Sequence, residues 1–231
     1  MGTSWKQAGK AVNANKRGAI ISKLCKEIAV AAKTGDPSPT NNPRLRTAVE
    51  AAKKQSVPRE NIERAIKKGA GLLEPVNYEF ITYEGFAPHK IPLIVECLTD
   101  NRNRTAADIR VLFRKGALGS AGSIAYMFDR MGLVEATHTD KSLDLESVAI
   151  EVGAQNVESS EEGARFFCDM TDLDSVSKAL MDAGWSVTAS EMVYLPKNPV
   201  EVPTDQKAEV TAFLDAIDDH DDVHRIYAAV K

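Results

Sequence analysis

The sequence lacks long hydrophobic runs, paired cysteines and a leader-like N-terminus. No apolar stretch approaches the roughly 18 residues that a membrane-spanning helix needs; the longest are short stretches such as Ile91–Leu98. The three cysteines lie about seventy residues apart without a Cys-x-x-Cys pair, which argues against a disulfide framework or a zinc ribbon. The N-terminal Met-Gly-Thr-Ser-Trp-Lys has no apolar signal region. These absences predict a cytoplasmic protein with no membrane partner.

Motifs that would mark an enzyme are also missing. The sequence holds no His-Glu-x-x-His and no Gly-x-Ser-x-Gly, and no cysteine has a nearby histidine. The glycine-rich segment Gly116–Ser123 lacks the Gly-Lys-Ser/Thr of a phosphate-binding loop, and we expect a mobile turn there. We therefore predict no catalytic residue and no cofactor.

Two histidines raise the alternative of a metal site. His220 and His224 have the i,i+4 spacing of helical metal ligands and lie among four aspartates. They also bridge the end of an expected helix and the start of an expected strand, where acidic turn residues are common. A working site needs further convergent ligands and groups that orient them, so we predict no metal.

Charge is abundant, and its distribution along the chain is uneven. The 231 residues have a formal net charge of -4. Residues 1–72 hold 15 Lys and Arg against 5 Asp and Glu, whereas residues 73–231 hold 14 against 28. This asymmetry favours a polyanion-binding N-terminal module on an acidic body. The alternative is a set of solvated helix faces that happen to be rich in lysine.

The basic segment has the pattern of three short helices. Apolar residues recur at helical spacing from Ile21, and Thr34–Pro37 supplies a Gly-Pro stop. Asn42-Pro43 has the form of an N-cap with proline at the first helical position. Pro58 opens a third amphipathic helix that ends near Gly69. The pattern predicts a three-helix bundle with a basic surface over residues 1–75.

Beyond residue 76 the pattern alternates between strands and helices, which predicts an α+β fold. The last helix and strand cannot form a domain alone, because an isolated strand leaves its backbone unpaired. We expect them to return to the sheet of a discontinuous middle domain, 76–137 plus 201–231, with 138–200 inserted; both are expected to be split βαβ (ferredoxin-like) domains. The expected strands are 80–83, 91–98, 124–128, 133–137, 155–159, 164–169, 187–195 and 223–230, and the expected helices are 105–115, 143–153, 172–183 and 204–218.

Lysines and arginines of the basic segment are the candidate phosphate contacts. Glu60–Arg64 and Glu63–Lys67 form i,i+4 acid-to-base pairs, so helix support competes with binding at these two cations. The first-helix lysines, Arg59 and Lys68 have no such partner in the helix pattern and are the stronger candidates.

The turn Asp100–Thr105 adds two arginines outside the basic segment. In one interpretation, these arginines contact a nucleic acid or a protein partner. In the other, they pair with nearby acidic side chains within a turn that caps the following helix. The predicted nucleic-acid-binding residues are Lys6, Lys10, Lys16, Arg17, Lys23, Lys26, Arg44, Arg46, Lys53, Lys54, Arg59, Lys68, Arg102 and Arg104.

Several segments resemble one known family along nearly the whole chain. The sequence departs from the family pattern at two places. The N-terminal arm, Gly2–Lys6, keeps the family's tryptophan but lacks its usual histidine. The glycine-rich stretch that commonly follows Tyr-Glu-Gly in the family is shortened here to Ala87–Lys90. The segments that resemble the YebC/PmpR family are Pro43–Arg46, Val57–Lys68, Tyr83–Phe86, Val95–Thr105 and Gly122–Phe128.

The resemblance implies both an architecture and a function. Family members are similar in having a helical bundle followed by two α+β domains. Bacterial members are described as DNA-binding transcriptional regulators, which implies promoter DNA as the partner of a non-enzymatic protein. A mitochondrial relative is a translational activator of cytochrome c oxidase, and bacterial relatives have been linked to stalled ribosomes. The resemblance therefore also implies the alternative of a translation factor that binds ribosomal RNA with the same surface.

Overall fold

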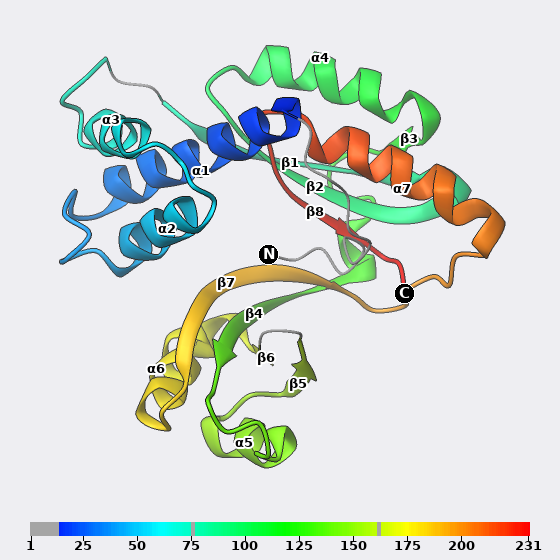
Figure 1. Cartoon of the computed structure of the whole chain (residues 1–231). Helices are drawn as coiled ribbons and strands as arrows, with labels where there is room; N and C mark the ends of the chain where they lie inside the picture. The colour runs from blue at the N-terminus through cyan, green and yellow to red at the C-terminus, as the bar shows by residue number, and fades with distance from the viewer. Residues whose placement is uncertain (1–13, 75–76, 161–162) are drawn as a thin grey trace. The chain divides into compact units, whose positions relative to one another are not determined.

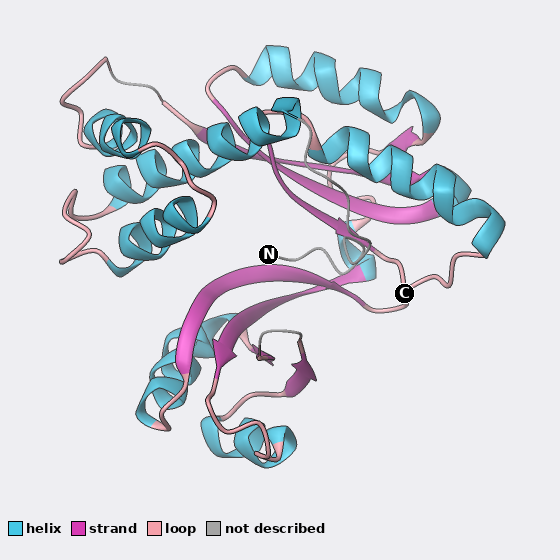
Figure 2. Ribbon diagram, in the orientation of Figure 1, coloured by secondary structure: helices cyan, strands magenta, loops and turns pink. Residues whose placement is uncertain are grey.

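A computed structural model describes residues 14–74, 77–160 and 163–231. It divides the chain into two compact units, residues 1–127 with 198–231, and residues 128–197. The described residues form seven α-helices and two four-stranded antiparallel sheets, so the prediction of an α+β fold with an N-terminal helical region is confirmed (Figures 1 and 2). No helix in these described stretches is long and apolar enough to cross a membrane.

The N-terminal helical region consists of α1 (Ala14–Thr34), α2 (Pro43–Lys54) and α3 (Arg59–Gly69). Asn42 begins α2 as predicted: its Oδ1 accepts from the Leu45 N–H at 3.0 Å, and its Nδ2 donates to the Ala31 carbonyl at 2.9 Å. Gly69 allows α3 to approach α1, because an added Cβ would collide with the Ala29 carbonyl oxygen. The core of this helical region consists of Ile28, Ala31, Ala32, Leu45, Ala48, Val49, Ala52, Val57, Ile62 and Ala65.

The first sheet has the strand order β3-β1-β2-β8. It comprises β1 (Glu79–Ala87), β2 (Ile91–Thr99), β3 (Ala117–Leu118) and β8 (Val223–Ala228), and β8 pairs with β2, so the end of the chain completes this sheet. Helices α4 (Arg102–Leu112) and α7 (Thr204–Asp218) pack on one of its faces (Figure 1). The alternation along β2 places Leu93, Val95 and Cys97 under these helices.

The second sheet belongs to residues 128–197 and has the order β5-β6-β4-β7. Its chain order is β-α-β-β-α-β, the ferredoxin-like arrangement with two split βαβ units. A core around Phe166, Leu180 and Trp185 joins the sheet to its two helices. The elements are β4 (Phe128–Thr137), α5 (Leu145–Val152), β5 (Asn156–Ser159), β6 (Ala164–Cys168), α6 (Leu173–Asp182) and β7 (Ser186–Pro196).

The segment between the two sheets differs from the sequence prediction. The sequence predicts a strand over residues 124–128, but Ala125–Met127 form a 3-10 turn. The Glu84 carboxylate accepts the backbone N–H groups of Ile124 and Ala125 at 2.7 and 2.8 Å, so these groups cannot join a strand ladder. The strand after this turn, β4, pairs with β6 and β7 and lies in the second unit instead of the middle domain.

Candidate nucleic-acid interface

The outer faces of α2 and α3 carry a set of exposed cations. The buried residues of these helices, including Leu45, Ala52 and Ile62, turn one face toward the core, so that the charged positions point outward. Arg46 is exposed but also holds the preceding loop, because its guanidinium donates to the carbonyls of Pro39 and Thr40 at 3.0 and 2.9 Å. The other exposed cations of α2 and α3 are Arg44, Lys53, Lys54, Arg59, Arg64 and Lys67.

Two lysines of α1, Lys23 and Lys26, lie in a different environment, because each pairs with an aspartate far away along the chain. The ammonium of Lys23 donates to the carbonyl of Asp218 and lies 3.3 Å from its carboxylate. Lys26 donates to a carboxylate oxygen of Asp222 at 2.6 Å and to the carbonyl of Asp221 at 2.9 Å. The helix pattern could not show these pairs, since the partners lie almost two hundred residues away in sequence. These lysines tie α1 to the first sheet.

Asp222 lies at the centre of the junction between α1 and the first sheet, and the sequence did not indicate this role. Its side chain is only 3% exposed and forms ion pairs with Lys26 and with Arg104, the latter at 2.9 Å. Burial alone would raise the pKa of the carboxyl group, but hydrogen bonds from Lys26, Arg104 and Thr105 lower it to about 2. Asp222 is therefore a charged group that joins α1, α4 and β8.

Arg104 pairs with nearby acidic side chains, in agreement with one of the two interpretations of its turn. Its guanidinium lies 3.0 Å from the Asp100 carboxylate in addition to its contact with Asp222. Asn101 caps α4 by accepting the Arg104 N–H at 3.1 Å. Arg102, in contrast, lies on the first turn of α4 with its side chain exposed.

The remaining predicted cations differ in their surroundings. Arg59 is 91% exposed but pairs with Glu63, four residues on, at 2.7 Å, so the expectation that it lacks an i,i+4 acidic partner is wrong. Lys68 is half-buried near Cys25, where burial raises the pKa of the thiol and Lys68 opposes that rise. Arg17 is exposed on α1. Lys6, Lys10 and the side chain of Lys16 lie outside the described residues.

The glycine-rich segment is held by a buried carboxylate. Glu84 accepts the backbone N–H groups of Gly122, Ile124 and Ala125 at 2.6 to 2.8 Å. Burial alone would raise the pKa of this carboxyl group, but these three hydrogen bonds lower it. The N–H groups that would cradle a phosphate are thus used by Glu84, and the expectation of a mobile turn gives way to an anchored loop.

The histidines have separate partners. His220 accepts the Asp222 N–H at its Nδ1 at 3.1 Å, and its Nε2 lies 3.3 Å from the Asp108 carboxylate. His224 stacks edge-on against Phe80 with ring centroids 5.8 Å apart. Burial, together with Arg225 and Lys23, lowers the pKa of His224 to about 3, so that the ring is neutral near pH 7. His220 lies in a turn and His224 in β8, so the two rings do not share a helix face.

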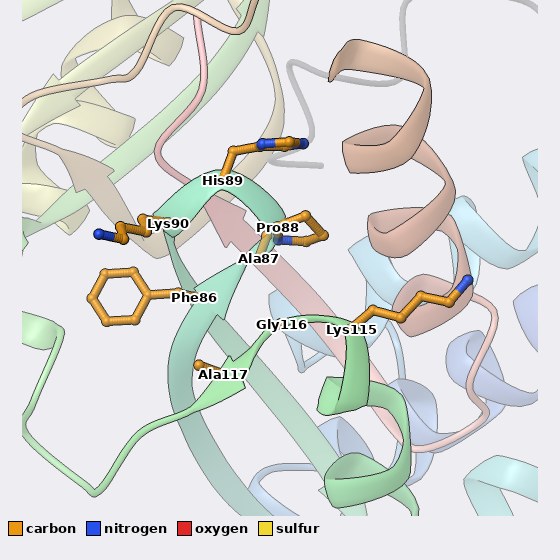
Figure 3. A pocket seen from close by; sticks show the side chains of 8 residues that line it. All are labelled: Phe86, Ala87, Pro88, His89, Lys90, Lys115, Gly116 and Ala117. Atoms are coloured by element: carbon orange, nitrogen blue, oxygen red, sulfur yellow. The ribbon is translucent and has the colours of Figure 1, made fainter. Parts of the chain in front are cut away.

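A pocket of about 420 Å³ lies at the end of the β1–β2 hairpin. Lys90 and Lys115 project away from each other on its two sides (Figure 3). The Nε2 of His89, also in its lining, lies 2.9 Å from the Glu209 carboxylate. Because its polar side chains diverge, this pocket does not form a convergent ligand site.

Fold and surface together define a class of protein: an α+β chain with a basic N-terminal helical region and no cluster of three metal-ligating side chains among its described residues. Two family descriptions match it, "TACO1/YebC protein N-terminal domain" over residues 2–72 and "TACO1/YebC second and third domain" over residues 78–230. The chain belongs to the TACO1/YebC family.

Named relatives and a solved structure agree with this membership. A "Probable transcriptional regulatory protein" of Pseudomonas savastanoi is 54% identical over all of this chain and 99% of its own length. One of the same description from Bdellovibrio bacteriovorus is 49% identical over the full length of both chains. The crystal structure of a conserved hypothetical protein from Aquifex aeolicus matches with a TM-score of 0.82 at 39% identity, covering 99% of this chain and 97% of that one.

Proposed function

We propose that this protein is a non-enzymatic, DNA-binding transcriptional regulator whose helical bundle binds the phosphate backbone through α2 and α3. The observation that carries the proposal is the division of cations within the bundle. Lys23 and Lys26 of α1 are paired with Asp218, at the end of α7, and with Asp222, just before β8. Arg44, Lys53 and Lys54, in contrast, stand exposed on α2. The relatives named probable transcriptional regulatory proteins make DNA the expected polyanion.

The chemistry of this surface suits backbone contact. Lys and Arg that neutralise phosphates release condensed counterions, so affinity depends steeply on salt and little on sequence. Such contacts fix the register of a protein on the duplex without reading bases. The bundle therefore supplies affinity in this proposal, and selection of promoters requires a further contact.

Crosslinking in cells followed by pull-down and separate sequencing of bound DNA and RNA tests the proposal. Enrichment of discrete promoter fragments over ribosomal RNA is expected. Dominant ribosomal RNA clustered at one ribosomal site would contradict it and make the protein a translation factor.

A charge-reversal variant tests whether the outer faces of α2 and α3 are the surface that binds DNA. Lys53, Lys54, Arg64 and Lys67 are changed together to Glu; the control changes four exposed lysines elsewhere, Lys141, Lys178, Lys207 and Lys231. If all four bundle cations contact phosphates, the slope of log affinity against log salt becomes shallower by about 3 to 4, since each contact contributes about 0.9. The control should keep the wild-type slope. Equal behaviour of the two variants would remove the bundle from the interface.

A further inference from the structure

Helix α4 and the 3-10 turn that follows it, Phe113–Lys115, form a basic segment within the acidic part of the chain. The segment Arg102–Lys115 holds five Lys and Arg and one acidic residue, Asp108, although residues 73–231 as a whole carry twice as many acids as bases. Asp108 lies 3.3 Å from His220. Figure 1 shows α4 on the outside of the first sheet, beside α7. The positive charge of this helix is thus concentrated where a partner can reach it.

The burial pattern of α4 defines its outer face. Thr105, Ile109 and Phe113 are buried against the sheet and α7. At 3.6 residues per turn, the opposite side presents Asn103, Ala107 and Arg110. Arg114 follows in the 3-10 turn Phe113–Lys115, which continues directly from the end of α4. All four are exposed. Asn103, Arg110 and Arg114 carry hydrogen-bond donors, and the small Ala107 between them lets a binding surface approach the helix closely.

Tyr83 of β1 is partly buried and packs against the core that lies beneath α4. Burial raises the pKa of the phenol above its ordinary value, and the positive charges of Arg102 and Arg110 oppose the rise. Among the described residues, β1 pairs with β3 only at Gly85 and Phe86, so the stretch of β1 that includes Tyr83 lies at the edge of the sheet.

We propose that the outer face of α4 is a second DNA-binding surface that reads base edges in the major groove. The proposal rests on the proposed function and supplies the selectivity that backbone contacts lack. Arginine can donate to O6 and N7 of guanine, and asparagine can pair with N6 and N7 of adenine. The helix is about 16 Å long, and the major groove is about 12 Å wide and admits a helix.

Binding of the full chain to two duplexes tests this role. The probes are a 30-base-pair duplex enriched by in vitro selection with the wild-type protein and a random-sequence duplex of the same length. In the variant Arg110→Ala/Arg114→Ala, preference for the selected duplex should fall at least about tenfold, while affinity for the random duplex falls much less. Arg110→Lys/Arg114→Lys keeps the charge but lacks the planar pair of donors, so it should keep affinity for the random duplex and lose the preference.

Lys141→Ala/Lys207→Ala is the matched control, and thermal melting confirms that each variant is folded. A preference that survives both arginine variants overturns the proposal, as does equal loss on both duplexes. If selection yields no enriched sequence, the reading of bases is excluded. If the α4 variants bind normally but Lys53→Glu/Lys54→Glu does not, the proposed function stands and this inference falls. If the wild-type protein binds an RNA hairpin but neither duplex, both fall.

Discussion

Lys23 and Lys26 of α1 belong to the same basic segment as the cations of α2 and α3 but have different surroundings. Lys26 is 13% exposed and bonded to Asp222, whereas Arg59 is 91% exposed and pairs with Glu63 on its own helix. A buried ion pair is costly to break because it leaves an unpaired charge, whereas an exposed pair contributes little. The count of basic residues therefore overstates the charge that is available to a partner.

The largest effect is expected at the junction itself. Asp222→Ala leaves Lys26 and Arg104 without their shared carboxylate, and removal of one partner from a buried ion pair costs about 3–5 kcal/mol. Urea unfolding followed by circular dichroism measures the loss. The control is Asp221→Ala, an exposed neighbour whose change should stay within about 0.5 kcal/mol. If both variants unfold at the same urea concentration, the junction does not stabilise the fold.

Acid should weaken the same junction. The pKa of Asp222 is about 2 in the folded protein against an ordinary value of 3.8. Because the folded pKa is depressed, its stabilisation of about 2 kcal/mol is complete above pH 4 and is lost as the pH falls toward 2. Unfolding free energies of wild-type protein and Asp222→Asn, compared between pH 5 and 2, should converge as the pH falls. A constant difference across this range would contradict the assignment.

Local pattern predicted much of the fold. Apolar spacing and the Asn42-Pro43 start gave α2, and the changed period after Tyr78 gave β1 and β2, because these signals involve neighbours in sequence. The partners of Lys26 and the anchoring of the glycine-rich loop by Glu84 were missed, since both join segments about 40 to 200 residues apart. The exposed cations of α2 followed from helical spacing alone. Sequence thus located candidate charges, and only the fold separated structural from accessible ones.

Replacing Lys26 separates stability from binding. Lys26→Met removes one donor from Asp222, which keeps Arg104, Thr99 and Thr105. We expect a loss of about 1–3 kcal/mol in the free energy of unfolding. Affinity for duplex DNA should change less than twofold, because the ammonium is already engaged within the protein. Fluorescence anisotropy with a labelled duplex measures this affinity. A loss of affinity as large as that of Lys53→Glu, with the fold intact, would return Lys26 to the interface.

The smallest effect tests whether an exposed pair limits binding. Glu63→Ala removes the carboxylate that lies 2.7 Å from Arg59, and stability should change by no more than about 0.5 kcal/mol because the pair is solvated. Loss of one negative charge from the outer face of α3 should raise affinity for duplex DNA a few-fold at low salt, with the gain fading as salt screens the surface. The matched control is Asp174→Ala, which breaks a comparable i,i+4 pair with Lys178 on α6 and should leave affinity unchanged. An equal gain in both variants would show that net charge, and not the face of α3, governs the attraction.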